Sequence, residues 1–524
     1  MKDKLKNISR FHIVIIMIML FSAAVLLYLT TIKSGMHVDE YLSYGLANNE
    51  YIGEVGSNKV RPEYGVRLAA TDVFDTFFYP DGFSIRNVWL NQGKDVHPPL
   101  YYLLLHIFTL IAHNFFALKT GVLLNIVIHM VNIVLVCLVL KALLSKEYEV
   151  ILGTILYAFV PIILGNVLFI RMYAMLSSFI LALTLLFVKE CKNPNRKTFY
   201  IKLGVISVFG ALTHYYFLIY LFYCCMIWGI YILCKRRWKE LVAFVGTMAV
   251  AGGVSIAIFP YMIKHIFSGD RGQQSFGNVL SLSTFIKNGK VFIPAIDNVY
   301  GGFLVAVIVA AVVLLIFRCI VWEKVKRKQN GINCWMMVFI PCIMYFLTIS
   351  KIAVLAATRY IAPMYALCII LLMGLFEKLT FYITDNDKAK CIVGILMISI
   401  LLNSSWKTYT WTELHSAAEE CINTARKYGV NNECIYIMNL SYHSLPGYQE
   451  FIQYQNMTFI RDNNLELLYT EEYSGYDHVV MYFDKSTGQE NIDEILAKMI
   501  EMNPGLNGYE ELHEYSYNIA YYLE

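Results

Sequence analysis

The chain has 524 residues, of which 57% are hydrophobic and only 16% are charged. This composition excludes an ordinary soluble domain and predicts a protein that crosses a membrane several times. The net charge is only +4 and no basic stripe is interleaved with aromatic residues, so nucleic acid is excluded as a partner.

The first long apolar run covers residues 11–32. It is longer than the apolar region of a secretory signal, so we expect a retained anchor. The basic stretch "MKDKLK" before it predicts a cytoplasmic N-terminus. Residues 33–118 should then form a first loop on the outer side, with interfacial helices.

Two adjacent carboxylates, Asp39 and Glu40, follow this anchor in the stretch "MHVDEYLSYG". A carboxylate at the outer end of a span can accept a proton from a hydroxyl held beside it. Asp is also a favoured N-cap residue, so Asp39 could instead begin a helix through "EYLSYGLANN". Glu40 could be a second functional carboxylate or a solvated one.

Further apolar runs follow along the chain and are the candidates for membrane spans. They cover residues 99–117, 119–143, 150–168, 174–189, 199–214, 216–234, 241–263, 301–320, 333–349, 359–377 and 389–406. Three basic connectors lie between some of them and should be cytoplasmic: "KECKNPNRK", "CKRRWKE" and "RCIVWEKVKRKQ". If every run crossed, all three connectors would be outside, so one early run does not cross.

The run at 99–117 is the best candidate for a helix that does not cross. Tyr102, His106, Thr109 and His113 fall on one helical face, which predicts an amphipathic helix lying in the membrane interface. Without this run the chain has about eleven spans, the three basic connectors are inside, and the C-terminus is outside.

The same count brings several polar groups to the outer ends of spans. His97 follows Asp95 in "DVHPPLYY", and its prolines suit the first turn of the next helix. His214 ends a span in "ALTHYYF" and, like His97, could form a site or simply hydrogen-bond to a neighbour. The remaining members of this group are Arg171, Tyr173, Lys351, Arg359 and Tyr360.

The arginines at these span ends indicate a phosphate site. Arg171 and Arg359 lie on the same side as Lys351, and a guanidinium pairs with phosphate through two parallel hydrogen bonds. Each arginine taken alone could instead extend its head group toward the lipid phosphates.

Residues 407–524 have the composition of a small α/β domain outside the membrane. Two amphipathic helices are predicted at 411–429 and 491–503, and two strands at 433–439 and 478–484. No catalytic motif is evident in this part. Most of the twelve cysteines lie in apolar runs, while Cys421 and Cys434 could form a disulfide if this domain faces an oxidising space.

Several of these motifs together resemble the GT-C membrane glycosyltransferases. They are the acidic pair after the first span, "HPPLYYLLLH", "RMYAM", "THYY" and "TRYIAPMYAL", in this order. The similarity is greatest to the bacterial branch related to protein O-mannosyltransferases and aminoarabinose transferases, and it covers residues 1–406. It implies an all-α polytopic bundle of the GT-C type, with the small C-terminal α/β domain of residues 407–524 outside the match.

The resemblance also implies roles for individual residues. Asp39 would be the general base that deprotonates the acceptor, and Glu40 would assist or orient it. Arg359 would hold the donor phosphate, with Lys351 and Arg171 as further cations. The pocket around the substrate would be formed by His97, Tyr173, His214 and Tyr360.

One feature departs from the family pattern. Relatives often carry an acidic residue near the "RxY" arginine, whereas the stretch here is "NVLFIRMY" and contains none. A second catalytic acid or metal ligand from that loop is therefore not expected. We expect no obligatory metal or cofactor, and Asp39 with Glu40 could hold a divalent ion only weakly.

The predicted function is a membrane glycosyltransferase at the outer face of the cytoplasmic membrane. It would transfer a sugar from a polyprenyl-phosphate donor to an acceptor lipid, glycan or protein, with inversion. A lipid flippase or transporter is an alternative, although such proteins favour charges at mid-membrane and repeated halves. A non-catalytic cell-wall assembly protein is a second alternative, and a glycan polymerase or ligase with two lipid-linked substrates is a third.

Overall fold

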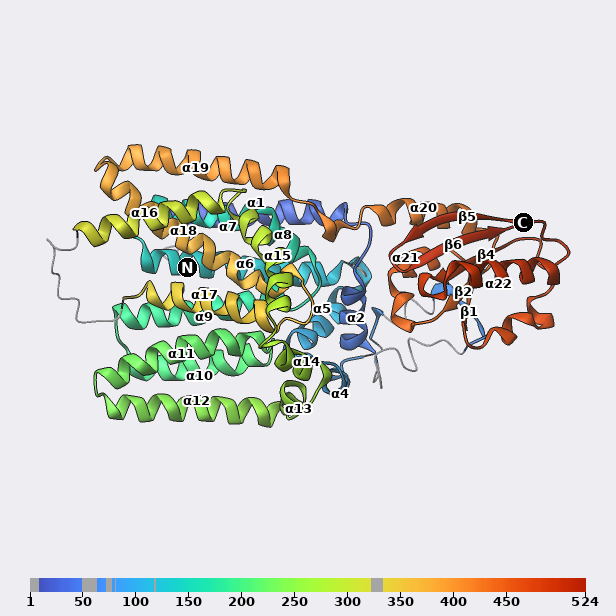
Figure 1. Ribbon diagram of the computed structural model, residues 1–524, viewed down its shortest axis with the longest axis horizontal. Helices are drawn as coiled ribbons and strands as arrows, with labels where there is room; N and C mark the ends of the chain where they lie inside the picture. The colour runs from blue at the N-terminus through green and yellow to red at the C-terminus, as the bar shows by residue number, and fades with distance from the viewer. Residues whose placement is uncertain (1–8, 50–63, 72–77, 81, 117–118, 322–332) are drawn as a thin grey trace, which may run out of the picture.

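The computed structural model describes residues 9–49, 64–71, 78–80, 82–116, 119–321 and 333–524. Long helices run side by side in a bundle, and a domain with a β-sheet lies beyond one end of the bundle (Figure 1). This arrangement confirms the predicted fold class, a helical membrane bundle followed by a small α/β domain.

Seven helical segments in the described ranges are long and apolar enough to cross a bilayer. They are α1 (Arg10–Thr31), α6 (Thr120–Leu143), α9 (Tyr173–Lys192), α11 (Tyr216–Cys234), α12 (Trp238–Ile258), η3 with α18 (Thr358–Ile383) and α19 (Asp387–Thr408). The number rises to nine if each of two bent pairs is one span: α7 (Glu147–Phe159) with α8 (Pro161–Leu168), and α15 (Leu282–Val299) with α16 (Leu304–Val321).

Two shorter apolar helices lie alongside these segments in the bundle (Figure 1), α10 (Arg196–Ala211) and α17 (Met336–Ile352). If both also cross, the total is the eleven spans predicted from the sequence. The connector between α9 and α10 and the connector between α11 and α12 lie at the end of the bundle remote from the sheet domain (Figure 1). The third basic connector lies largely outside the described residues.

The two bends have local causes. Pro161 is the first residue of α8, where it lacks the N–H that would continue the ladder of α7, and the two helices meet at 49°. Gly301 and Gly302 separate α15 from α16 and both have positive φ angles, 61° and 85°. A side chain at Gly301 would lie 2.6 Å from the carbonyl oxygen of Leu401, so this turn requires glycine.

The helix predicted at 99–117 is α5 (Leu100–Phe116), a short apolar helix at the end of the bundle near the sheet domain (Figure 1). Its polar face, which predicted an amphipathic helix in the membrane interface, is turned into the protein. Tyr102, His106 and Thr109 are buried, and α5 packs on α2 (Val38–Asn48), α4 (Ile85–Lys94) and α6. The side chain of His113 lies outside the described part.

The sheet domain contains six strands in the order β1-β3-β2-β4-β6-β5. Their bounds are β1 Arg67–Ala69, β2 Cys434–Met438, β3 Asn456–Arg461, β4 Val479–Asp484, β5 Tyr509–Tyr515 and β6 Asn518–Leu523. The central strands β2 and β4 are parallel and buried on both faces, which explains why their apolar runs were visible in the sequence. The predicted helices correspond to α20 (Ala417–Gly429) and α22 (Gln489–Met502).

Two features of this domain differ from what the sequence patterns indicated. The edge strand β1 comes from the first loop and pairs antiparallel with β3, so the sheet is not built from residues 407–524 alone. Cys421 and Cys434 are both buried free thiols, so the structure contains no disulfide between them.

A buried ion pair joins the bundle to the segment that leads into the sheet domain. Glu40 is fully buried, and it accepts hydrogen bonds from the Lys33 ammonium at 3.1 Å and from the backbone N–H groups of His37 at 2.8 Å and Ile170 at 3.0 Å. The Lys33 ammonium also donates to the backbone carbonyl of Glu413 at 2.6 Å. Four segments of the chain therefore meet at this ion pair: the residues after α1, the start of α2, the loop before α9 and the segment between α19 and α20.

We predict that Glu40→Gln lowers the free energy of unfolding by about 3–5 kcal/mol, because it leaves the Lys33 charge buried without a partner. Thermal and denaturant unfolding of the purified protein in detergent would measure this loss. Asp387→Asn is the matched control, since the Asp387–Lys146 pair is about half exposed and its removal should change stability little. Equal effects of both substitutions would contradict the assigned role of Glu40.

Candidate active site

The first turn of α2 separates the two adjacent carboxylates. His37 is the N-cap residue, its ring accepts the backbone N–H of Asp39 at 3.1 Å, and Glu40 accepts the backbone N–H of His37 in return. The alternative in which Asp39 caps this helix is therefore wrong. Neighbouring side chains on an α-helix point about 100° apart. Glu40 thus faces the buried lysine while Asp39 faces a different set of partners.

Asp39 is held between two arginines from distant parts of the chain. Its Oδ1 atom accepts a hydrogen bond from Arg171 Nη2 at 3.1 Å, and its Oδ2 atom accepts one from Arg359 Nη2 at 2.8 Å. Arg171 lies in the loop between α8 and α9, and Arg359 lies in the short helix η3 (Thr358–Ile361). The second guanidinium edge of Arg171 donates to the Tyr102 hydroxyl.

The charges of this group do not cancel. Burial would raise the pKa of Asp39, but the guanidinium groups of Arg171 and Arg359 outweigh burial and hold the pKa well below its ordinary value. Asp39 is therefore ionised at neutral pH. Because two cations share one carboxylate, the group carries a net positive charge and attracts anions.

Histidines and tyrosines extend the site from Arg171. His97 Nδ1 lies 2.7 Å from Asp95 Oδ2, and the rings of His97 and His214 are 5.7 Å apart between centroids. The ring centroid of Tyr173 lies 5.6 Å from that of His214 and 5.9 Å from that of Tyr360. Four predicted pocket residues are thus neighbours, although they come from four separate segments. Asp95, which the sequence patterns marked only as a neighbour of His97, forms part of the same group.

Two of the predicted site residues do not belong to this cluster. Lys351 lies in the last turn of α17, and in the described part of the chain no hydrogen bond or ion pair connects it with Asp39 or the arginines. Glu40 was predicted as a second catalytic carboxylate. It is fully buried and paired with Lys33, an arrangement that favours the other predicted role, in which Glu40 orients α2 and with it Asp39.

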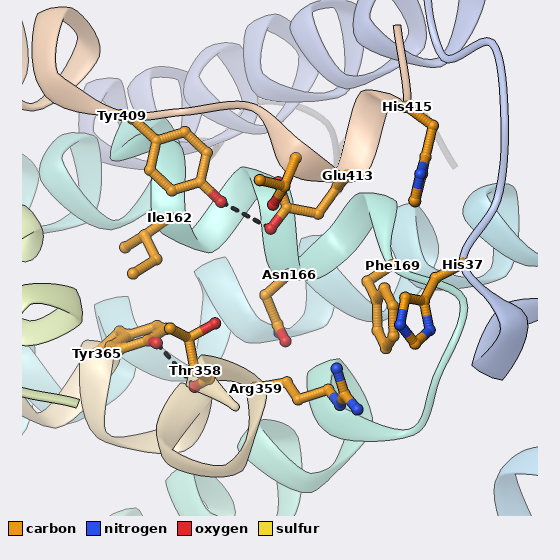
Figure 2. Close-up of a pocket in the computed structure, with 11 residues that line it drawn as sticks. His37, Ile162, Asn166, Phe169, Thr358, Arg359, Tyr365, Tyr409, Glu413 and His415 are labelled. Atoms are coloured by element: carbon orange, nitrogen blue, oxygen red, sulfur yellow. Dashed lines mark hydrogen bonds between the residues drawn. The ribbon is translucent and has the colours of Figure 1, made fainter. Parts of the chain in front are cut away.

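A cavity of about 150 Å³ opens beside Arg359 (Figure 2). His37 and Arg359 form one side, Asn166 of α8 lies in the middle, and Tyr409 and Glu413 cover the other side. The last two belong to the segment between α19 and α20, which joins the bundle to the sheet domain. Residue patterns did not identify Asn166, Tyr409 or Glu413. For Glu413 the reason is that "WTELH" was interpreted as the start of an amphipathic helix.

The described ranges contain no group of three or more His, Cys, Asp or Glu side chains arranged to hold a metal ion. Asp39 faces two arginines and Glu40 faces a lysine. A divalent ion shared by both carboxylates would require each of them to leave its cationic partner.

Neither a protein-family model nor a curated protein sequence matches the chain. Among solved structures it is similar to ArnT from Cupriavidus metallidurans bound to undecaprenyl phosphate, with a TM-score of 0.50 and 10% identity over 96% of this chain and 97% of ArnT. The chain has the fold of ArnT. This likeness confirms the predicted GT-C fold of a multi-pass membrane protein, and it extends through the sheet domain, beyond the resemblance found in the sequence.

A second similar structure is the oligosaccharyltransferase AglB from Archaeoglobus fulgidus in complex with an inhibitory peptide and a dolichol-phosphate. The TM-score is 0.49 and the identity 9%, over 96% of this chain and 74% of AglB. At identities this low, the likeness to ArnT establishes the fold, and the chemistry of this chain has to be argued from its own residues.

The pKa of Asp39 generates a prediction for stability. Because this pKa lies below the ordinary value of 3.8, the ion pairs stabilise the folded chain fully above about pH 4 and are lost as the pH falls toward the folded-state value. We expect wild type to unfold at a higher temperature than Asp39→Asn at neutral pH. This difference should shrink between about pH 4 and pH 3.

Thermal unfolding of both proteins in detergent across this pH range would measure the difference. Asp385→Asn is the control, because Asp385 is exposed in the connector between α18 and α19. A difference between wild type and Asp39→Asn that stays constant down to pH 3 would show that the Asp39 ion pairs do not contribute to stability.

Proposed function

We propose that this chain is a membrane glycosyltransferase that transfers a sugar from a polyprenyl-phosphate donor to an acceptor hydroxyl or amine, with inversion. The observation that carries the proposal is the carboxylate of Asp39 held between Arg171 and Arg359, beside a cavity with polar and aromatic lining residues. This group lies at one end of a bundle with the ArnT fold, and the ArnT structure is a complex with undecaprenyl phosphate.

The two arginines are suited to the donor phosphate. A guanidinium is always charged at neutral pH and matches the spacing of phosphate oxygens. Arg359 is the more accessible of the two, with 21% of its side chain exposed against 6% for Arg171. We therefore assign Arg359 to the phosphate and Arg171 to holding Asp39. Lys351 is left as a cation that could assist only after a movement of α17.

The reaction is a single displacement at the anomeric carbon. The acceptor oxygen or nitrogen forms the new bond to this carbon, and the bond from the carbon to the phosphate oxygen breaks. The electron pair of the broken bond leaves with the phosphate, and the proton of the acceptor passes to Asp39. Arg359 stabilises the negative charge that grows on the leaving phosphate, so it lowers the barrier and not only the dissociation constant.

Asp39 has to regain basicity for this role. With two arginine partners its pKa is held low, so it is a weak base in the ligand-free protein. A donor phosphate bound to Arg359 competes with Asp39 for the same guanidinium. This competition frees one carboxylate oxygen and moves the pKa of Asp39 back toward its ordinary value. Donor binding would then prepare the base for the acceptor.

His97 is the second candidate base. Its Nδ1 atom pairs with the buried carboxylate of Asp95, which fixes the orientation of the ring. Together with Tyr173, His214 and Tyr360 it forms the wall that continues from Arg171. Aromatic rings of this kind pack on the apolar faces of sugars and of acceptor groups.

We predict that Asp39→Asn reduces turnover by about 10²–10⁴-fold, because it removes the proton acceptor but keeps the size of the side chain. The assay measures sugar transfer by the purified protein in detergent with lipid, from a panel of polyprenyl-phosphate sugars. Asp385→Asn serves as the matched control and should retain full activity.

The outcomes of this assay separate the candidate functions. Turnover that survives in Asp39→Asn and disappears in His97→Gln would assign the base to His97. A wild-type protein that binds donors without consuming any of them would overturn the proposal and favour a lipid flippase or a non-catalytic assembly protein.

The proposed orientation places the N-terminus in the cytoplasm and the sheet domain outside. The basic connectors after α9 and α11 lie at the opposite end of the bundle from Asp39, as positively charged cytoplasmic loops would. We predict that alkaline phosphatase fused to the C-terminus is active in cells, whereas a fusion within residues 234–240 is inactive. The reverse pattern of activity would invert the orientation.

A further inference from the structure

Three buried polar atoms around the cavity have no hydrogen-bond partner within the described residues. They are Asn166 Oδ1, Arg359 Nε and Glu413 Oε2, and all three residues line the cavity beside Arg359 (Figure 2). A buried polar group without a partner costs about 1–3 kcal/mol. Because such groups are rare in folded proteins, three of them around one cavity indicate a place for a polar ligand.

The position of Glu413 is fixed from several sides. Its Oε1 atom accepts a hydrogen bond from the Tyr409 hydroxyl at 2.9 Å, and its backbone carbonyl accepts the Lys33 ammonium. Gly165 of α8 allows this approach, since a side chain there would meet the Tyr409 hydroxyl and lie 3.0 Å from Glu413 Oε2. One carboxylate oxygen is therefore held in place and the other is left toward the cavity.

The unpartnered atoms define the chemistry of the ligand. Asn166 Oδ1 and Glu413 Oε2 are acceptors, and Arg359 Nε is a donor. A ligand that satisfies all three must offer at least two donors and one acceptor. Neighbouring hydroxyl groups meet this requirement, because each of them both donates and accepts. A phosphate offers only acceptors, and a lipid chain offers neither.

The walls and the volume of the cavity fit one sugar ring. Phe169, Tyr365 and Tyr409 contribute aromatic surfaces to the lining. A cavity of about 150 Å³ admits a six-membered ring, as benzene binding in an apolar cavity of that volume illustrates. Arg359 connects the cavity with Asp39, since its Nη2 atom holds the carboxylate while its Nε atom borders the cavity.

On the basis of the proposed function, we propose that this cavity binds the sugar of the donor and that Glu413 and Asn166 accept hydrogen bonds from its hydroxyl groups. The sugar would then lie beside the guanidinium that binds the phosphate. Burial raises the pKa of Glu413, and a hydroxyl donor at Oε2 would offset part of this effect. Glu413 thus determines the specificity for the sugar, and it comes from the segment that leads into the sheet domain.

The test compares the binding of two classes of ligand to the full-length protein in detergent. Geranylgeranyl phosphate measures the phosphate site, and geranylgeranyl-phosphate-linked hexoses, pentoses and amino sugars measure the additional effect of the sugar. For wild type we expect at least one neutral sugar to lower the dissociation constant about tenfold relative to the phosphate alone. In Glu413→Gln this gain should be lost, with binding of geranylgeranyl phosphate unchanged.

Asn166→Ala is the second variant and should reduce the same gain, while Glu419→Gln, on the exposed side of α20, should keep it. Unchanged binding of geranylgeranyl phosphate shows that each variant is folded. A gain that persists in both Glu413→Gln and Asn166→Ala would overturn the inference.

Three further outcomes concern the ligand itself. A gain restricted to amino sugars would overturn the assignment to hydroxyl groups. If wild type binds geranylgeranyl phosphate but no sugar adds affinity, the inference fails while the proposed function stands. If wild type does not bind geranylgeranyl phosphate at all, the proposed function fails together with the inference.

Discussion

The buried pair of Lys33 and Glu40 is the interaction on which the geometry of the site depends. Neither charge can be left without a partner inside the protein, so the ends of the segments that meet there are fixed relative to each other. Glu40 also accepts the backbone N–H of Ile170, which places the following residue, Arg171, opposite α2. The direction of the Asp39 side chain follows from the same constraint. Asp39 is adjacent to Glu40 on α2, so its side chain points to a different side of the helix.

The adjacent carboxylates therefore have opposite tasks. Glu40 is fully buried and paired with Lys33, while Asp39 pairs with two arginines from distant parts of the chain. Arg171 and Arg359 each donate a hydrogen bond to a different oxygen of Asp39, so both guanidinium groups point toward one carboxylate. Groups held in place before the ligand arrives need little reorganisation during a reaction. The same arrangement holds the pKa of Asp39 below its ordinary value.

The sheet domain is attached to the end of the bundle that contains the site. The ring of Tyr41 on α2 lies 6.0 Å from the ring of Tyr448, and Gly35 approaches α20 so closely that a side chain there would lie 2.9 Å from Ala418 Cβ. Strand β1 of the first loop completes the edge of the sheet. With Glu413 in the connecting segment, any change in the placement of this domain would also move a wall of the cavity.

Local patterns in the sequence determined the membrane character, the apolar helices, and the strands β2 and β4. They also determined that polar groups gather at one end of the spans. These features depend on hydropathy and periodicity over a few neighbouring residues, which any single segment displays by itself. The order of the motifs along the chain indicated the GT-C fold. This order can be read from the sequence without knowing how the segments pack.

Only the tertiary structure decided which side chains meet. Arg171 and Arg359 lie 132 and 320 positions from Asp39 in the chain, and no local pattern specifies that both bind one carboxylate. The burial of Glu40 depends on the segments packed around it, and strand β1 is defined by its pairing with β3. The cavity at Glu413 exists because a connecting segment closes over α8, and contacts between distant segments are what a sequence does not display.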